Sequence, residues 1–222
     1  MIRKSLPIIL FIISIDFFCL AGHSFYKTYF VTNDNIEKNI QVWEEIYETE
    51  RVQIPEKEII EEPENVEEEI IEEPVIEEKP EIILPEYKEG DLLGTIQFSN
   101  SDKIIPLKYG HTDELLDEGN GCVEDRVLSV PGRDNNSVIY GHREEVFWDL
   151  KDIQIGDEIY IEMREGYMTF KVYELNVMNP KDTYIYEESD KSIITLVTCY
   201  PFVYMGRVEA RYIVKAELIS TE

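Results

Sequence analysis

The chain has 222 residues, 43% of them hydrophobic and 31% charged, with a net charge of −26. This length suits one domain with attachments, and the strong negative charge argues against nucleic acid as a partner, because phosphate binding needs a basic surface. Three cysteines do not make the dense disulfide framework of a small secreted domain.

Residues 1–30 are predicted to form a membrane anchor. Two basic residues precede an apolar run of 17 residues, from Leu6 to Gly22, which as a helix would be about 26 Å long. Asp16 opposes insertion by about 3 kcal/mol, and the surrounding Leu, Ile and Phe residues offset that cost. The alternative is a cleaved signal peptide, for which the sequence offers no convincing cleavage site. We therefore expect a single-pass protein of the cell membrane with its bulk outside.

Residues 31–88 are predicted to form a disordered acidic stalk. Between Glu44 and Glu89 the sequence has 19 Glu and no Asp against four basic residues, a net charge of −15. Five prolines interrupt any long helix, and the like charges repel one another and extend the chain. The alternative is a docking segment, because paired isoleucines could add to the edge of a sheet.

Residues 89–222 have short apolar runs separated by turn signals, which is typical of a β domain. Seven such runs lie at 92–98, 103–109, 136–141, 157–163, 167–175, 191–199 and 210–218. Seven or more strands at this spacing predict an all-β barrel or sandwich.

Three local patterns add detail to this domain. The stretch "EIYIEMREGYMTFKVYEL" predicts a hairpin that turns at residues 164–166. "HTDELLDEG" predicts one short helix, capped by Thr112 and ending at Gly119. "REEVFWDLKD" predicts a second short helix or a turn.

The stretch "TLVTCYPF", residues 195–202, ends a predicted strand at Cys199. A cysteine nucleophile needs a group that moves protons and a donor for the developing oxyanion. His142 follows an apolar strand and a glycine, where it can face a cleft, and Arg211 stands immediately before another apolar strand. From chemistry alone two interpretations stay open: a catalytic set, or a packed core thiol with a surface histidine and a surface arginine.

These motifs resemble those of the sortase family. "TLVTC" is followed 12 residues later by Arg211 in "RYIV", with "GHR" upstream, so the order of His, Cys and Arg matches the family. "VIYGHR" and the later "GDEI" also match, and "NPKDTYIY" ahead of "LVTCYPF" is similar to the class D branch. The resemblance covers roughly residues 90–222, including the opening "GDLLGTIQF".

The resemblance implies a closed sortase-type β-barrel with short helices and a cysteine transpeptidase activity. Cys199 would attack an LPxTG-like sorting signal on a surface protein, and His142 would act as general acid and then as general base. Arg211 would orient the substrate and stabilise the oxyanion. An amine on lipid II or peptidoglycan would then resolve the thioacyl intermediate. The chemistry requires no cofactor.

Three further residues are implied to contact the substrate: Thr198, Tyr140 and Tyr200. Sortases are commonly tethered to the membrane and face the wall of Gram-positive bacteria, which fits the anchor at 1–30 and the stalk at 31–88. The catalytic domain would then be residues 89–222.

Cys122 stands where many class D relatives have a histidine, and Tyr140 where relatives often have a small residue. A Cys122–Cys199 disulfide would silence the enzyme. One alternative function is a cysteine hydrolase that uses water as acceptor. Another is a zinc-binding or structural module with Cys122, Cys199, His111 and His142 as ligands, although no C-x-x-C spacing supports it.

The resemblance also suggests a calcium site, because some sortases use calcium. The acidic residues in the loops that flank the predicted cleft are Glu124, Asp125, Glu187, Glu188 and Asp190. Acidic loops on an acidic protein are usually only solvated, so both readings stay open.

Overall fold

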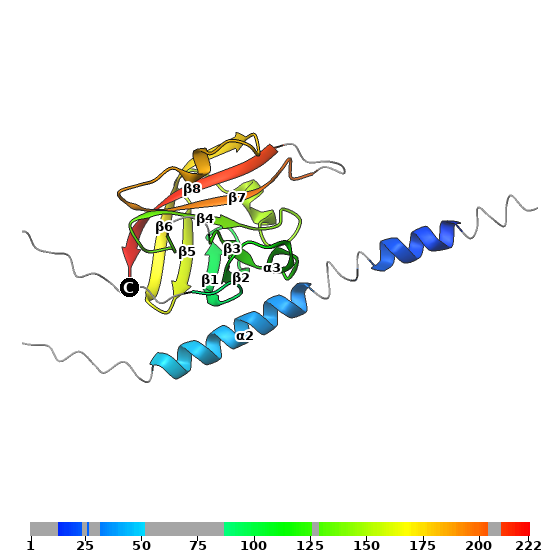
Figure 1. Cartoon of the computed structure of the whole chain (residues 1–222), viewed down its shortest axis with the longest axis horizontal. Helices are drawn as coiled ribbons and strands as arrows, with labels where there is room; N and C mark the ends of the chain where they lie inside the picture. The colour runs from blue at the N-terminus through cyan, green and yellow to red at the C-terminus, as the bar shows by residue number, and fades with distance from the viewer. Residues whose placement is uncertain (1–12, 24–25, 27–31, 52–86, 126–128, 204–209) are drawn as a thin grey trace, which may run out of the picture.

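The computed structural model describes residues 13–23, 26, 32–51, 87–125, 129–203 and 210–222. Its main body is a closed barrel of eight strands (Figure 1) in the order β1-β2-β3-β4-β7-β8-β6-β5. The strands are β1 (Leu92–Phe98), β2 (Ile104–Tyr109), β3 (Gly121–Val123), β4 (Asn135–Tyr140), β5 (Glu158–Met163), β6 (Gly166–Met178), β7 (Ser192–Tyr200) and β8 (Ala210–Thr221). The predicted closed β-barrel is therefore confirmed, and β3 is the short strand that the sequence pattern missed.

Side chains that alternate along the strands fill the barrel. In β5 every second residue is buried, as expected for a strand with one face toward the core. Phe98, Phe147 and Phe170 are fully buried, and the rings of Phe98 and Phe147 lie 5.7 Å apart. Burial of each such ring contributes about 2 to 3 kcal/mol.

The predicted hairpin and short helices are present. β5 and β6 pair as an antiparallel hairpin from Glu158↔Lys171 to Met163↔Gly166. The helix α3 (Asp113–Asp117) begins after Thr112, whose hydroxyl accepts from the Leu115 amide. Two short 3₁₀ helices follow, η2 (Trp148–Asp152) and η3 (Tyr184–Tyr186).

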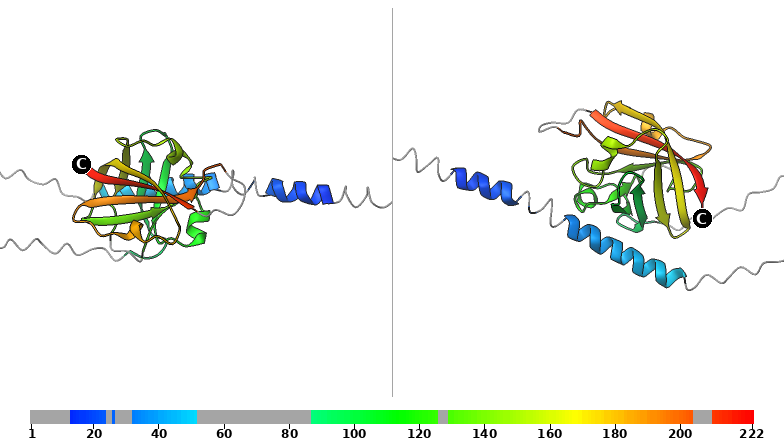
Figure 2. Two further views of the ribbon diagram at one scale, coloured as in Figure 1. Left: turned by 90° about the horizontal axis from the view of Figure 1, so that it is seen from above. Right: turned by 180° about the vertical axis from the view of Figure 1, so that it is seen from behind.

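The helix α2 (Thr32–Arg51) corrects the predicted stalk, whose disordered character is wrong over residues 32–51. Thr32, Ile36 and Trp43 are only 3%, 6% and 2% exposed, and their spacing of four and seven residues places them on one helical face. That face packs against the barrel on the side of β1 and β2 (Figures 1 and 2). The rest of the predicted stalk, up to residue 86, lies outside the described residues.

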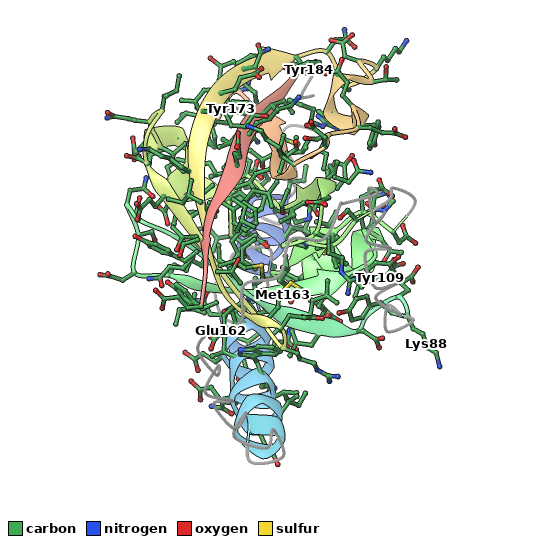
Figure 3. The ribbon with its side chains drawn as sticks, turned by 90° about the vertical axis from the view of Figure 1, so that its left-hand side faces the viewer. Lys88, Tyr109, Glu162, Met163, Tyr173 and Tyr184 are labelled. Atoms are coloured by element: carbon green, nitrogen blue, oxygen red, sulfur yellow. The ribbon has the colours of Figure 1, made fainter. Side chains whose placement is uncertain are left out.

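A groove remains where α2 meets the barrel, lined by Ile40, Trp43, Thr95, Tyr160 and Glu162 among others. Figure 3 shows Glu162 at the end of the barrel nearest α2. The helix lies on the barrel surface, and Ile36 joins the same hydrophobic cluster as the barrel core.

The predicted membrane anchor needs correction. In the described part of this segment, residues 13–23 are helical and include Asp16. Among the described residues, none of the helices combines the length and apolar character that a membrane crossing requires. This contradicts the anchor and the membrane localisation inferred from it. Residues 1–12 lie outside the described part.

Candidate active site

Cys199 lies at the end of β7, directly opposite Arg211 at the start of β8. Directly opposed residues of an antiparallel pair project from the same face, with Cβ atoms about 4.5 to 5.5 Å apart. Both residues are partly exposed, and Arg211 Nη1 donates to the carbonyl oxygen of Ala210 at 3.3 Å. The register of two strands thus brings the predicted nucleophile and the predicted cation together.

His142 is held beside the same strand end by a parallel pairing. β4 runs alongside β7 in a register that ends at Tyr140↔Val197. The Gly141 amide then donates to the Val197 carbonyl at 3.3 Å, and Thr198 Oγ1 donates to the Gly141 carbonyl at 2.8 Å. The turn that carries His142 therefore lies beside the end of β7, which holds Cys199.

The backbone at Gly141 passes close to the core. A Cβ at this position would lie 2.7 Å from the ring of Phe147, which is fully buried. The His142 carbonyl also accepts from the Phe147 amide at 3.0 Å. A buried aromatic ring therefore fixes the turn that carries the histidine.

Carboxylates surround His142. Its Nε2 lies 3.2 Å from Oδ1 of Asp117, the last residue of α3. Glu145 follows in the same loop, and burial is the main cause that raises the pKa of its carboxyl. The charges of Asp117 and Glu144 raise this pKa further, whereas those of His142 and Lys103 lower it. Sequence reasoning identified neither Asp117 nor Glu145, because only the folded loop brings them to the histidine.

The three predicted substrate-contact residues have different environments. Thr198 is 3% exposed, and its hydroxyl already donates to Gly141. Tyr140 is partly exposed, and its hydroxyl lies 2.7 Å from that of Tyr186. Tyr200 is partly exposed and stacks on Tyr212 with ring centroids 6.2 Å apart, and its bond to the following proline is cis.

The loop between β6 and β7 is fixed at the edge of this site. Asn136 Nδ2 donates to the carbonyls of Ile185 and Glu187 at 2.8 and 3.1 Å, and its Oδ1 accepts from Thr195 at 2.7 Å. In the same part of the barrel, Tyr184 and Tyr173 lie near one another (Figure 3).

Tyr184 and Tyr173 lie near charged groups at that end of the barrel. Tyr184 donates to Glu174 at 2.8 Å, and Lys215 Nζ lies 3.4 Å from the centroid of its ring. Burial, followed by the charge of Glu174, raises the pKa of Tyr173 to about 12.

Cys122 is a different kind of cysteine. It is fully buried in β3 and unbonded to another cysteine. Burial raises the pKa of its thiol to about 12, with smaller opposing contributions from Lys108 and Glu118. The structure therefore contains no Cys122–Cys199 disulfide.

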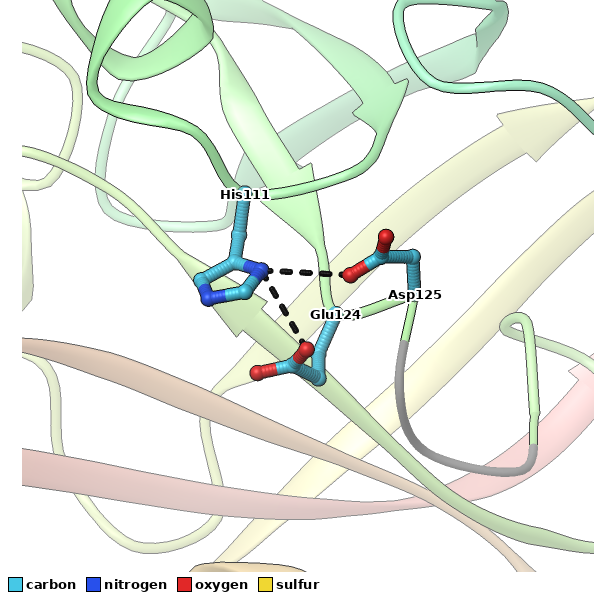
Figure 4. A group of neighbouring side chains, drawn as sticks. All are labelled: His111, Glu124 and Asp125. Carbon is cyan, nitrogen blue, oxygen red and sulfur yellow. Dashed lines mark hydrogen bonds and ion pairs between the residues drawn. The ribbon is translucent and has the colours of Figure 1, made fainter.

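Neither of the predicted metal-ligand sets gathers as a whole. In the part of the chain that the structure describes, the one group with suitable ligand atoms is His111, Glu124 and Asp125, whose ligand atoms all lie within 4.8 Å of one another (Figure 4). His111 Nδ1 lies 3.2 Å from Glu124 and 3.3 Å from Asp125, so the two carboxylates contact the same ring nitrogen. The His111 and Tyr140 rings are tilted relative to one another, with centroids 5.4 Å apart.

A cysteine, a histidine and an arginine at one edge of a closed β-barrel can carry out acyl transfer through a covalent thioester. The model of the family "Sortase domain" matches residues 97–219. This match covers more than half of the chain, and the chain belongs to the sortase family.

One similar relative is the Sortase D of Bacillus subtilis. The two sequences are 26% identical over 132 residues, which is 59% of this chain and 66% of the relative. The chain therefore matches just under two thirds of that relative's length.

Two solved structures from Clostridium perfringens are also similar. One is a Sortase D5 transpeptidase, 25% identical with a TM-score of 0.57, and the match covers 86% of this chain and 99% of that one. The other is a sortase C with a C-terminal cell wall sorting motif, 28% identical with a TM-score of 0.53 over 60% of this chain and 74% of that one. Relatives with the class D designation agree with the predicted branch.

Proposed function

We propose that the domain at residues 89–222 is a cysteine transpeptidase that cleaves an LPxTG-like sorting signal and joins the cleaved protein to an amine. The observation that carries this proposal is the strand register that sets Cys199 opposite Arg211 and beside the turn of His142. Membership of the sortase family and a relative solved with a cell wall sorting motif support the same reaction.

In the first half-reaction the Sγ of Cys199 attacks the carbonyl carbon of the Thr–Gly-type amide. A C–S bond forms and the C–N bond breaks, and His142 gives its proton to the leaving amine. Arg211, a permanent cation opposite the nucleophile, donates to the oxygen that gains negative charge.

In the second half-reaction an acceptor amine attacks the thioester carbonyl. His142 takes the proton from that amine, a new amide forms, and Cys199 leaves as the thiolate. The proposed acceptor is an amine of the cell wall, on lipid II or peptidoglycan, and the proposed donor is a surface protein that bears the sorting signal.

The substrate contacts are assigned by exposure and position. Tyr140 and Tyr200 end the two strands that meet at the site, and both are partly exposed. Thr198 contributes through the turn, because its hydroxyl holds the carbonyl of Gly141 next to His142.

The test mixes the full chain with quenched LPxTG and LPxTA peptides, with and without an added amine. Mass spectrometry identifies the products, and Cys199→Ala is assayed in parallel. We expect Cys199-dependent cleavage and a product joined to the amine. Cleavage that yields only the free acid at saturating amine would instead support the hydrolase, and cleavage by Cys199→Ala would refute the proposed nucleophile.

A further inference from the structure

Asp117 contacts His142 from outside the barrel. The Nε2 of His142 and Oδ1 of Asp117 lie 3.2 Å apart, and the two side chains are 36% and 55% exposed. An ionised carboxylate only accepts hydrogen bonds, so Nε2 carries the proton of this contact. The other ring nitrogen, Nδ1, then remains to exchange protons with the reacting amine.

The helix that supplies Asp117 has little anchorage of its own. None of the five residues of α3 is buried. The C-cap residue Glu118 makes a 2.9 Å ion pair with Lys108 of β2, and partly exposed pairs of this kind contribute little. Leu115 packs near Gly110, and the turn after α3 supplies further contacts that can set the position of Asp117.

The helix α2 packs against that turn. A Cβ on Gly119 would lie 2.4 Å from Cγ2 of Thr32 and 3.0 Å from Ile36, so the two segments approach as closely as a glycine allows. Gly119 also has a φ of +83°, which favours glycine, and it stands two residues after Asp117.

A hydrogen-bond chain joins the same two segments. Asn39 Nδ2 of α2 donates to Asn120 Oδ1 at 3.1 Å. Asn120 is fully buried, and its Nδ2 donates to the Leu115 carbonyl of α3 at 2.8 Å. Packing and hydrogen bonding thus both connect α2 with the helix that carries Asp117.

We propose that Asp117 is a positioning residue for His142, and that α2 holds α3 where this contact can form. The inference rests on the proposed transpeptidase function. It gives α2 a role in catalysis that is transmitted through its contacts with Gly119 and Asn120, in the turn after α3. Detaching α2 would free Asp117 and with it the His142 ring.

The direct test compares Asp117→Asn, Asp117→Glu and the control Glu114→Gln in the full chain with the peptide and amine assay. Glu114 is an exposed carboxylate on the same helix. We expect Asp117→Asn to lower kcat about fivefold with KM unchanged, as suits a partly exposed charge pair. Asp117→Glu should restore part of the loss, and Glu114→Gln should match the natural chain.

The link to α2 is tested with Ile36→Asp and its matched control Val42→Asp. Ile36 is 6% exposed against the α3 turn, whereas Val42 is 47% exposed on the same helix. We expect Ile36→Asp to lower kcat as Asp117→Asn does, and Val42→Asp to leave it unchanged. In the Asp117→Asn background Ile36→Asp should have no further effect, because both act through one contact.

The outcomes separate this inference from the proposed function. A natural chain without transpeptidase activity would refute the function itself. An active natural chain whose kcat is unchanged by both Asp117→Asn and Ile36→Asp would overturn the inference alone. Fully additive losses of kcat in the double variant would show that α2 does not act through Asp117. A melting temperature equal to that of Val42→Asp shows that Ile36→Asp remains folded.

Discussion

Cys199 and Arg211 are directly opposed residues of the antiparallel pair β7–β8, so the backbone register fixes their separation. Cys199 is the penultimate residue of β7 and Arg211 the second residue of β8, one pair before the ladder stops at Tyr200↔Ala210, and both are partly exposed. The proposed nucleophile and the proposed cation therefore need no mobile loop to bring them together.

This relationship predicts the effect of changing Arg211. Loss of one oxyanion donor typically costs about 10² to 10³ in kcat, and we expect that loss for Arg211→Ala in the peptide assay. Arg211→Lys should recover little, because an ammonium lacks the planar fork of donors.

Arg164→Ala is a suitable control for the same assay. Arg164 lies in the β5–β6 turn, and the pairing of Met168 with Thr221 places that turn at the opposite end of β8 from Arg211. Equal losses in the Arg164 and Arg211 variants would show that overall charge, and not the site, sets the rate.

The environments of the cysteines predict selective alkylation. Burial raises the pKa of Cys122 to about 12, so at neutral pH it contains almost no thiolate, whereas Cys199 is partly exposed. Treatment of the folded chain with iodoacetamide, followed by peptide mapping, should modify Cys199 and leave Cys122 intact. Cys19 is exposed and should react as an internal reference. Equal labelling of Cys122 and Cys199 in folded protein would contradict this account.

The close approach at Gly141 predicts a loss of stability on adding one methyl group. Gly141→Ala would place a Cβ 2.7 Å from the ring of Phe147, and such overpacking typically costs about 1 to 3 kcal/mol. Gly121→Ala is the matched control, since its Cβ would meet nothing nearer than 3.4 Å. Thermal unfolding should show a clear drop for the first variant and a small change for the second. A similar drop for both would mean that the turn is not specially constrained.

The raised pKa of Glu145 predicts a pH-dependent stability. Burial is the main cause, and Oε2 is buried with no hydrogen-bond partner among the described residues. A carboxyl whose folded pKa is raised favours folding most fully below its unfolded pKa, and that contribution is lost as pH rises through the folded value. Glu145→Gln should therefore raise stability by about 1 kcal/mol near pH 7 and by much less at pH 4.

Unfolding curves of the natural chain and of Glu145→Gln across that pH range measure the difference. A stabilisation that is the same at pH 4 as at pH 7 would show that ionisation of Glu145 is not its source.

Much of the barrel could be predicted because its strands carry short apolar runs with clear turns. The hairpin around residues 164–166 and the helix after Thr112 also followed from local signals. β3 could not be predicted because its three residues are too few to show a periodic pattern. The order of His142, Cys199 and Arg211 could be predicted from motifs, whereas their proximity depends on the β4–β7–β8 register.

The amino-terminal half was harder to predict, because composition obscured a helical pattern. The spacing of Ile36, Ile40 and Trp43, four and then three residues, is typical of a helix. The glutamate-rich composition of the segment that follows led instead to the prediction of a disordered stalk. The Asp117 contact could not be predicted, because it joins a helix and a loop 25 residues apart through tertiary packing.

If Cys199 forms a thioester with the substrate, the adduct can be trapped when no acceptor amine is present. The full chain is mixed with an LPxTG-like peptide without amine, quenched in acid and measured by intact mass and peptide mapping. We predict a mass increase equal to the peptide fragment before the scissile bond, located on Cys199, discharged by added amine and absent from Cys199→Ala. Peptide cleavage without any adduct on Cys199, or an adduct on another residue, would contradict the account.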